Sequence, residues 1–414
     1  MPSYSGRYQY LDASAVPQSQ GPCQVAFDAT TCIVTPAGST PLAFDLGDID
    51  SAAPGEWDLG LVLYTGHTLV LRQFGAAFSR MCEELLAAWR DRTVQCLLLE
   101  DLQELARYEG AANGGPAQVR IFKTNLAILP RAGTPVQWRL AEVDSCAFDD
   151  AAYAITLTSA GERLVLSKLA KKTDEAFGVL REAIDALHTH AAGALHELFP
   201  FLDAGALVRL QLAMPEGRSC ALPALAAIHP NLPETLRARA VDEALAPYID
   251  ALGQRAAGPL FAGFKFITPT SGASESGEAE DSVSGDEPPP EPPSPDSSTE
   301  APLFFWYFFP LAGQVAAWEA TTGSGRATYF FSTPDPVAAS IASLTRGLAL
   351  INFRREPVYL PDASLESQPR FHRYAIGARK LPDLRSLRAT FRGRAIHTAL
   401  EPWLTQVLSI PGQV

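Results

Sequence analysis

No stretch of this sequence is apolar for long enough to cross a membrane as a helix. The longest apolar run, LFFWYFF at residues 303–309, has about a third of the roughly 20 residues that such a helix needs. The opening residues, MPSYSGRYQYLDAS, also lack the basic segment and the apolar core of a secretory signal. We therefore expect no membrane span and no secretion signal, and we expect LFFWYFF to form a buried strand.

The sequence also lacks the short motifs of the common catalytic sites: GxSxG, GxxxxGK[ST], HExxH and GxGxxG do not occur. His188, His190 and His196 are close in sequence, but their spacing on a helix does not bring three imidazoles to one metal. We predict no catalytic residue, no cofactor and no metal site, and hence a protein that is not an enzyme. The alternative is an enzyme with an unrecognised site, for which Glu356 and His397 are the polar residues to follow.

None of the six cysteines, at positions 23, 32, 82, 96, 146 and 220, belongs to a CxxC pair. A chain of 414 residues, of which 47% are hydrophobic and 19% charged, can bury two or three cores without disulfide bonds. We expect reduced, mostly buried thiols in a cytoplasmic protein.

Residues 268–301 contain nine acidic residues, no basic residue and almost no apolar side chain to bury. Such a proline-rich acidic segment is predicted to be a disordered linker. It carries most of the formal net charge of −13 and leaves −4 on the rest of the chain. We interpret it as a tether or a surface-loop insertion. The alternative is an acidic arm that binds a basic partner.

Two parts of the chain resemble each other at a spacing of 94 residues. LGDIDS at 46–51 returns as LAEVDS at 140–145. The same spacing pairs three apolar residues of the first copy, Leu59, Leu61 and Leu63, with Tyr153, Ile155 and Leu157. One inserted residue then superposes LVL at 69–71 on LVL at 164–166. We predict a tandem repeat of one fold.

Within each copy, short strands are followed by one amphipathic helix. In the first copy, WDLGLVLY is predicted to be a strand with Trp57 on the same face as Leu59, Leu61 and Leu63. The apolar residues from Phe78 to Trp89 then recur at helical spacing. The second copy ends in a helix whose apolar positions are Phe177, Leu180, Ile184 and Leu187.

This order of strands and one closing helix resembles the pleckstrin-homology-like (PH-like) superfold, and Trp89 in the first closing helix adds to the resemblance. The resemblance implies an α+β, mainly β fold. Antiparallel β-sandwich or partly open barrel modules would each be closed by a C-terminal helix. We place module 1 at residues 20–110 and module 2 at 117–196.

The acidic residues of the repeated segment are Asp48 and Asp50 in the first copy and Glu142 and Asp144 in the second. A DxD pair can bind a divalent cation, but such a site needs further oxygen ligands, and the sequence supplies none. We interpret the four residues as polar positions at the turn that leaves a strand. Their role would then be structural, not metal binding.

The remaining sequence is predicted to form a helical connector at 197–260 and a C-terminal α+β domain. That domain combines 261–267 with 302–414, on either side of the acidic segment. Its strands are followed by a helix with Val337, Ile341, Leu344 and Leu348 on one face. A degenerate third PH-like module is an alternative interpretation of this domain.

The chain is basic only near its C-terminus, where residues 353–395 contain ten Lys or Arg, four acids and interleaved aromatic residues. Such a segment can form an anion- or partner-binding face. The candidate residues are Arg354, Arg355, Arg373, Arg385, Arg388 and Arg392. The interpretation that we prefer is structural, with these arginines pairing with acids of neighbouring elements.

PH-like modules can bind protein segments along a sheet edge or in the groove beside the helix. We therefore predict a non-enzymatic cytoplasmic adaptor or scaffold with an unidentified protein partner. The alternative is a nucleic-acid- or chromatin-associated factor that uses the basic C-terminal face and the acidic linker, an architecture similar to that of histone chaperones.

Inositol phosphates need several basic side chains around the first hairpin of a PH-like module. The first copy has none at residues 23–36, and the second offers Arg120, Lys123 and Arg131. We therefore do not expect an inositol-lipid partner. The high Ala and Arg usage suggests a GC-rich bacterial source.

Overall fold

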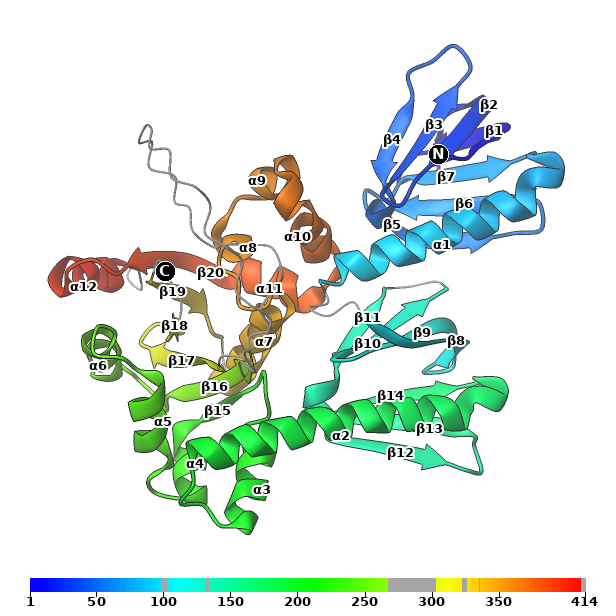
Figure 1. Cartoon of the computed structure of the whole chain (residues 1–414). Coiled ribbons are helices and arrows are strands. Elements are labelled where there is room, and N and C mark those ends of the chain that lie inside the picture. The colour runs from blue at the N-terminus through cyan, green and yellow to red at the C-terminus, as the bar shows by residue number, and fades with distance from the viewer. Residues whose placement is uncertain (99–102, 132–133, 267–302, 322–325, 335, 411–414) are drawn as a thin grey trace, which may run out of the picture. The chain divides into compact units, whose positions relative to one another are not determined.

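The computed structural model describes residues 1–98, 103–131, 134–266, 303–321, 326–334 and 336–410. The chain forms two compact units. Unit 1 comprises Met1–Ala191 and Ser343–Ala389, and unit 2 comprises Ala192–Ala342 and Thr390–Val414. Figure 1 labels the elements of both. The acidic segment predicted to be disordered lies outside the described residues.

Module 1, the first part of unit 1, contains a seven-stranded antiparallel sheet with the order β4-β3-β2-β1-β7-β6-β5. Its strands are β1 (Ser3–Leu11), β2 (Pro17–Phe27), β3 (Thr31–Pro36), β4 (Leu42–Asp45), β5 (Ile49–Pro54), β6 (Asp58–Leu63) and β7 (Thr68–Arg72). Because β1 pairs with both β2 and β7, β4 and β5 are the two edge strands. The 3₁₀ turn η1 (Leu46–Asp48) joins them, so LGDIDS forms this turn and the start of β5.

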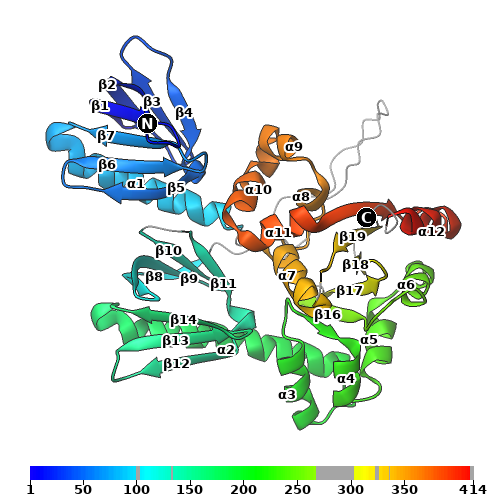
Figure 2. The same cartoon turned by 180° about the vertical axis from the view of Figure 1, so that it is seen from behind.

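The core of module 1 follows the alternation of its strands. Leu59, Leu61, Leu69 and Leu71 are buried on one face of β6 and β7. Helix α1 (Phe78–Cys96) adds its apolar stripe to the same core, with buried residues that include Phe78, Met81, Cys82, Leu85 and Trp89. Figure 1 and Figure 2 show α1 lying along β5–β7.

Two features of module 1 differ from the sequence prediction. The module starts at β1, well before residue 20, and β1 pairs with β2 from Ser3 to Leu11. This strand escapes pattern analysis because only Tyr8 in it is fully buried. Trp57 does not join the buried face of β6 but is 69% exposed. The reason is that β6 begins at Asp58, so Trp57 belongs to the preceding turn. A hydrogen bond from Gly55 N to Asp58 O closes this turn.

Module 2 has the equivalent sheet order, β11-β10-β9-β8-β14-β13-β12. Its strands are β8 (Glu104–Ala112), β9 (Gly115–Phe122), β10 (Asn125–Pro130), β11 (Val136–Arg139), β12 (Ser145–Asp149), β13 (Ala154–Ser159) and β14 (Glu162–Ser167). Helix α2 (Thr173–Leu198) closes the module and continues into unit 2. LAEVDS forms the 3₁₀ turn η3 (Leu140–Glu142) and the start of β12.

The strand register corrects one part of the predicted alignment. Leu59 pairs with Leu71 in module 1, and Ile155 pairs with Leu166 in module 2. Leu59 is therefore equivalent to Ile155, not to Tyr153, and Trp57 is the residue equivalent to Tyr153. The turn before β13 is two residues longer than the turn before β6. A shift of two residues keeps the same side chains inward, so the alternation pattern cannot detect it.

Five helices complete unit 1 together with the two modules. They are α7 (Val337–Leu350), which begins in unit 2, α8 (Glu356–Tyr359), α9 (Asp362–Ser367), α10 (Pro369–Lys380) and α11 (Pro382–Thr390), whose last residue belongs to unit 2. The sequence placed all of residues 302–414 in one C-terminal domain, whereas 343–389 belong to unit 1. The contact between α10 and α1 explains this difference.

Unit 2 contains a six-stranded antiparallel sheet whose strands follow in sequence order. They are β15 (Ser219–Ala221), β16 (Phe261–Phe266), β17 (Leu303–Leu311), β18 (Val315–Ala320), β19 (Ala327–Ser332) and β20 (Phe391–Ile396). The LFFWYFF run lies in β17 and is almost entirely buried, as predicted. Five more helices of this unit are α3 (Ala204–Ala213), α4 (Leu222–Ile228), α5 (Leu232–Ala240), α6 (Ala246–Gly253) and α12 (Leu400–Ser409).

The expected fold class is confirmed: antiparallel modules closed by C-terminal helices are followed by a third α+β region. Within the described ranges, no helix combines the length and the apolar character needed to span a membrane. The six cysteines are free, and five of them are buried.

Unit 2 buries a polar cluster around Glu319 of β18. Its carboxylate Oε1 lies 3.0 Å from His397 Nε2 and accepts a hydrogen bond from the Thr328 hydroxyl. Trp403 Nε1 donates to Thr328 Oγ1 over 2.9 Å, and the Tyr248 ring stacks on His397 with centroids 4.1 Å apart. The Glu319 and His397 side chains are 1% and 6% exposed, so each depends on the other for polar contact.

We expect His397→Leu to destabilise unit 2 by about 3 kcal/mol, because Glu319 would stay buried without its imidazole partner. The double variant Glu319→Met with His397→Leu should recover part of this loss, since no buried carboxylate is then left without its imidazole partner. Chemical denaturation followed by tryptophan fluorescence measures both. A double variant less stable than the single one would contradict this explanation.

Candidate functional site

The most polar feature of module 1 is the edge where β4 passes through η1 into β5. It carries Asp45, Asp48 and Asp50, which we call the acidic edge. The Asp45 carboxylate caps η1 by accepting a hydrogen bond from Gly47 N over 2.7 Å. The Asp45 and Asp48 side chains are only 13% and 15% exposed, whereas that of Asp50 is 50% exposed. Two of the three carboxylates are therefore largely removed from water and need charged partners.

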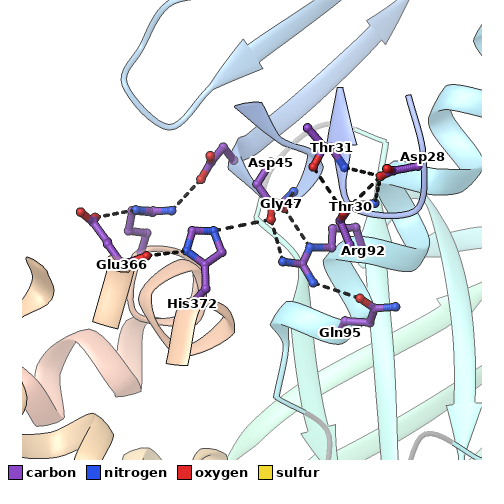
Figure 3. A network of polar contacts seen from close by, with 11 residues as sticks. Asp28, Thr30, Thr31, Asp45, Gly47, Arg92, Gln95, Glu366 and His372 are labelled. Atoms are coloured by element: carbon purple, nitrogen blue, oxygen red, sulfur yellow. Dashed lines mark hydrogen bonds and ion pairs between the residues drawn. The ribbon is translucent and has the colours of Figure 1, made fainter. Parts of the chain in front are cut away.

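Asp45 receives basic side chains from two helices. Arg92 of α1 binds it in a bidentate manner, with Nε to Oδ1 at 2.8 Å and Nη2 to Oδ2 at 2.7 Å. His372 of α10 places Nε2 3.5 Å from Asp45 Oδ2. Figure 3 shows Asp45 between these two side chains. The planar fork of an arginine fixes the orientation of the carboxylate as well as its charge.

The end of α10 supplies the partners of the other two carboxylates. Arg379 Nη2 lies 2.6 Å from Asp48 Oδ1, and its guanidinium lies 4.1 Å from the centroid of the Tyr64 ring. Lys380 Nζ donates to Ile49 O over 2.8 Å and lies 3.1 Å from Asp50 Oδ1. Lys380 is 5% exposed, so its ammonium group depends on these acceptors.

Two glycines allow α10 to approach this closely. A Cβ atom on Gly377 of α10 would lie 2.9 Å from Leu98 Cδ1 and 3.1 Å from Cys96 O. A Cβ atom on Gly47 of η1 would lie 2.9 Å from Cys96 Sγ and 3.0 Å from Ile376 Cδ1. Side chains at either position would separate the helix from the edge.

Trp89, noted in the sequence for its place in the closing helix, supports the same edge from inside the module. Its indole Nε1 donates to Ile49 O over 3.1 Å. The Ile49 carbonyl thus accepts hydrogen bonds from both Trp89 and Lys380, which uses both of its lone pairs.

Burial affects the protonation of two groups here, Asp48 and Cys96. Desolvation raises the pKa of Asp48 above its usual value of 3.8, although the Arg379 guanidinium acts in the opposite direction. Burial also raises the pKa of the Cys96 thiol, to about 12, which makes it a packing residue rather than a nucleophile.

Module 2 uses the equivalent positions differently. Arg139 replaces Asp45, and its Nε lies 3.4 Å from Glu142 Oε1 within the same turn. Asp144 Oδ2 accepts a hydrogen bond from Ala160 N. In module 2, Glu142 is thus buried and Asp144 is exposed, whereas the acidic residues of module 1 contact α10. No group of three or more His, Cys, Asp or Glu in the described ranges could hold a metal ion.

The six arginines of the predicted anion- or partner-binding face lie in both units. Arg388 donates to the carbonyl groups of Pro357 and Leu360 and pairs with Asp362 at 2.6 Å, so it ties α11 to α8 and α9. Arg385 donates to Arg379 O. Arg373 is exposed and donates to Tyr374 Oη over 3.1 Å.

The remaining three arginines are Arg354, Arg355 and Arg392. Arg354 and Arg355 are half-buried just before α8 and, like Arg373, Arg385 and Arg388, belong to unit 1. Arg392 lies on β20 of unit 2 and donates to Ser332 Oγ. Whether these arginines bind an anion or a partner stays a prediction.

The two residues considered for an unrecognised enzyme site are Glu356 and His397. Glu356 belongs to unit 1 and His397 to unit 2, where His397 contacts Glu319 and Thr328.

One basic residue considered for inositol phosphates in module 2, Arg120, has an acidic partner. Arg120 is 3% exposed and lies 2.7 Å from Asp91. Glu319 and Asp91 were missed in the sequence because no local spacing links either residue to its partner.

No family model and no curated protein matches this chain. Among solved structures, it is similar to "The pleckstrin homology (PH) domain of USP37", with 16% identity and a TM-score of 0.18, over 22% of this chain and 98% of that one. It is also similar to "Structure of the Spt16D Pob3N heterodimer", with 17% identity and a TM-score of 0.17, over 42% of this chain and 87% of that one. At these identities and TM-scores, neither likeness bears on what this chain binds.

Gly377→Ala is expected to destabilise unit 1 by roughly 1–3 kcal/mol, because the new methyl group would press on Leu98 and Cys96 O. Gly178→Ala in α2 is the matched control: its Cβ would meet no described atom within 4 Å, so helix propensity alone should stabilise it by up to about 1 kcal/mol. Urea denaturation measures both. Shifts in the same direction would contradict the close approach of α10.

Asp48→Asn tests whether desolvation, which raises the pKa of Asp48, outweighs the Arg379 guanidinium, which lowers it. A carboxyl with a raised pKa in the folded chain contributes less stability as the pH rises from 3.8 through that raised value. The asparagine variant should therefore gain stability relative to the wild type over this rise in pH, measured by urea denaturation at several pH values. A relative loss of stability over the same window would show that the attraction of Arg379 dominates.

Proposed function

We propose that the chain is a non-enzymatic cytoplasmic adaptor of bacterial origin whose PH-like modules bind protein segments. One observation supports the proposal above others. Module 1 already holds α10 through the acidic edge, and the paired residues Asp48 and Arg379 are 331 positions apart in the sequence. A module that captures a basic helix of its own chain has the chemistry to capture such a helix from a partner.

The contacts at the acidic edge favour a basic helical ligand. Three carboxylates face three basic side chains of α10, which gives complementary charge over the length of one helix. The Ile49 carbonyl adds an acceptor from the backbone of β5. The close approach at Gly47 and Gly377 then requires a small residue in the helix at the point of contact.

The nucleic-acid- or chromatin-associated alternative depends on basic side chains near the C-terminus that are available to an anion. Arg379, Lys380 and Arg388 make ion pairs within unit 1. These pairs reduce the charge available for phosphate, which is why the adaptor is the function that we propose.

A charge-swap experiment in the full chain tests the adaptor. The probe is a fluorescent peptide with the sequence of residues 362–381. We expect it to bind the variant Arg379→Glu with Lys380→Glu, whose own α10 is repelled from the acidic edge. A second peptide with these two reversals should instead bind the variant Asp48→Lys with Asp50→Lys. Each matched pair should bind at least about tenfold more tightly than the mismatched pairs, measured by fluorescence anisotropy at low and physiological salt.

The control variant, Asp150→Lys with Glu162→Lys, changes the same number of charges at exposed positions of module 2. Its own α10 stays in place, so it should bind neither peptide more tightly than the wild type does. Circular dichroism establishes that each variant is folded. Equal binding of both peptides to all variants, or no binding to any, would refute the proposal.

A further inference from the structure

Module 1 has an open pocket of about 560 Å³ beside the start of α1. It is lined by residues of the turn before β6, the end of β7 and the segment that leads into α1. The lining residues are Glu56, Trp57, Asp58, Arg72, Gln73, Phe74, Gly75 and Phe78. The volume falls within the range of pockets that bind small ligands or a few side chains.

Trp57 is the feature of this pocket that the fold does not explain. Its side chain is 69% exposed, and within the described ranges it makes no hydrogen bond and no ring contact. Phe74 and Phe78, by contrast, are 5% and 6% exposed and belong to the core of module 1. Phe74 and Phe78 are therefore held in the core of module 1. The exposed Trp57 indole, which also lines the pocket, has no hydrogen-bond or ring partner among the described residues.

In module 2, the aromatic residue at the equivalent position makes contacts within the module. Tyr153, the residue equivalent to Trp57, donates to Asp174 Oδ2 over 3.2 Å and packs edge-on against Phe148, with centroids 5.7 Å apart. Trp57 has neither kind of contact. Tyr153 is itself 45% exposed, so what distinguishes module 1 is that its exposed aromatic residue lacks these two contacts.

The charges around the pocket define what it can bind. Glu56 and Asp58 flank Trp57 and are both exposed, and neither makes an ion pair with any described residue. An indole face beside two carboxylates is a favourable environment for a cationic side chain. Arg72 contributes the opposite charge, and its Nε is buried without a hydrogen-bond partner among the described atoms.

We propose that this pocket is a second docking site of module 1, for a peptide segment with a lysine or arginine side chain. The cation lies against Trp57 and between the carboxylates of Glu56 and Asp58. An apolar side chain of the segment covers Phe74 and Phe78. This inference rests on the proposed function, that the modules bind protein segments, but it concerns a different surface from the acidic edge.

The test uses the full chain labelled with 5-fluorotryptophan, in which ¹⁹F NMR resolves the six tryptophans individually. Trp57→Phe and Trp89→Phe assign the two informative signals. Trp57 reports on the pocket, and Trp89, hydrogen-bonded to Ile49 O, reports on the acidic edge. The probes are acetylated, amidated tetrapeptides with the sequence Ala-Phe-Lys-Ala and two matched peptides with norleucine or glutamate in place of lysine.

The lysine peptide should shift the Trp57 signal saturably, with an apparent Kd about tenfold lower than that of the norleucine peptide. Glu56→Gln with Asp58→Asn should remove this preference. The matched control Asp150→Asn with Glu162→Gln, which neutralises two exposed acids of module 2, should retain it.

Two results would overturn the inference. One is a Trp57 signal that no peptide shifts or that all three peptides shift equally. The other is a lysine-dependent shift of Trp89 alone, which would place the cation at the acidic edge and leave the proposed function standing. Failure of the charge-swap experiment, with a lysine-dependent Trp57 shift, would instead refute binding at the acidic edge and leave the pocket as a binding site.

Discussion

The pairing of the carboxylates at the acidic edge is the interaction on which the organisation of unit 1 depends. Asp45 and Asp48 are largely withdrawn from water, and a buried carboxylate without a charged partner costs several kcal/mol. Arg92 supplies one partner from within module 1, and α10 supplies the others. The helices at 343–389 therefore belong with the modules rather than with the sheet that precedes them in sequence.

The two modules show how one fold takes different roles through a few side chains. Both place a 3₁₀ turn between their edge strands, and both put acidic residues there. In module 2 an arginine stands at the position of Asp45 and forms an ion pair with Glu142 within the turn. In module 1 three carboxylates share one edge and require cations from elsewhere. The same turn thus forms an ion pair within itself in module 2 and contacts a distant helix of the chain in module 1.

The sequence predicted much of this fold because alternation and helical spacing respond to burial. It identified the strands around Leu59 and Leu69, the stripe of α1 and the buried strand β17. It missed β1, where Tyr8 alone is fully buried, and it placed Trp57 inside, because alternation does not reveal where a turn ends. It interpreted Asp48 and Asp50 as polar residues at a turn, and Asp48 lies in η1 while Asp50 lies at the start of β5. It could not pair them with Arg379 and Lys380, because no local pattern links residues more than 300 positions apart.

Lys380 indicates that the acidic edge selects its ligand more than it stabilises the fold. Burying the Lys380 ammonium group to 5% exposure costs a large free energy of desolvation. Burial also raises the pKa of Asp48, although Arg379 is close to it. We therefore expect these charges to stabilise the fold little more than apolar side chains would. What the charges do provide is discrimination, because a segment without a cation at the position of Arg379 would leave the largely buried Asp48 without this ion pair. The carbonyl of Ile49 adds a geometric condition, since the donor must reach it beside the Trp89 indole. Under the proposed function, these conditions would favour a basic helix with a small residue at its point of contact, which is what α10 provides.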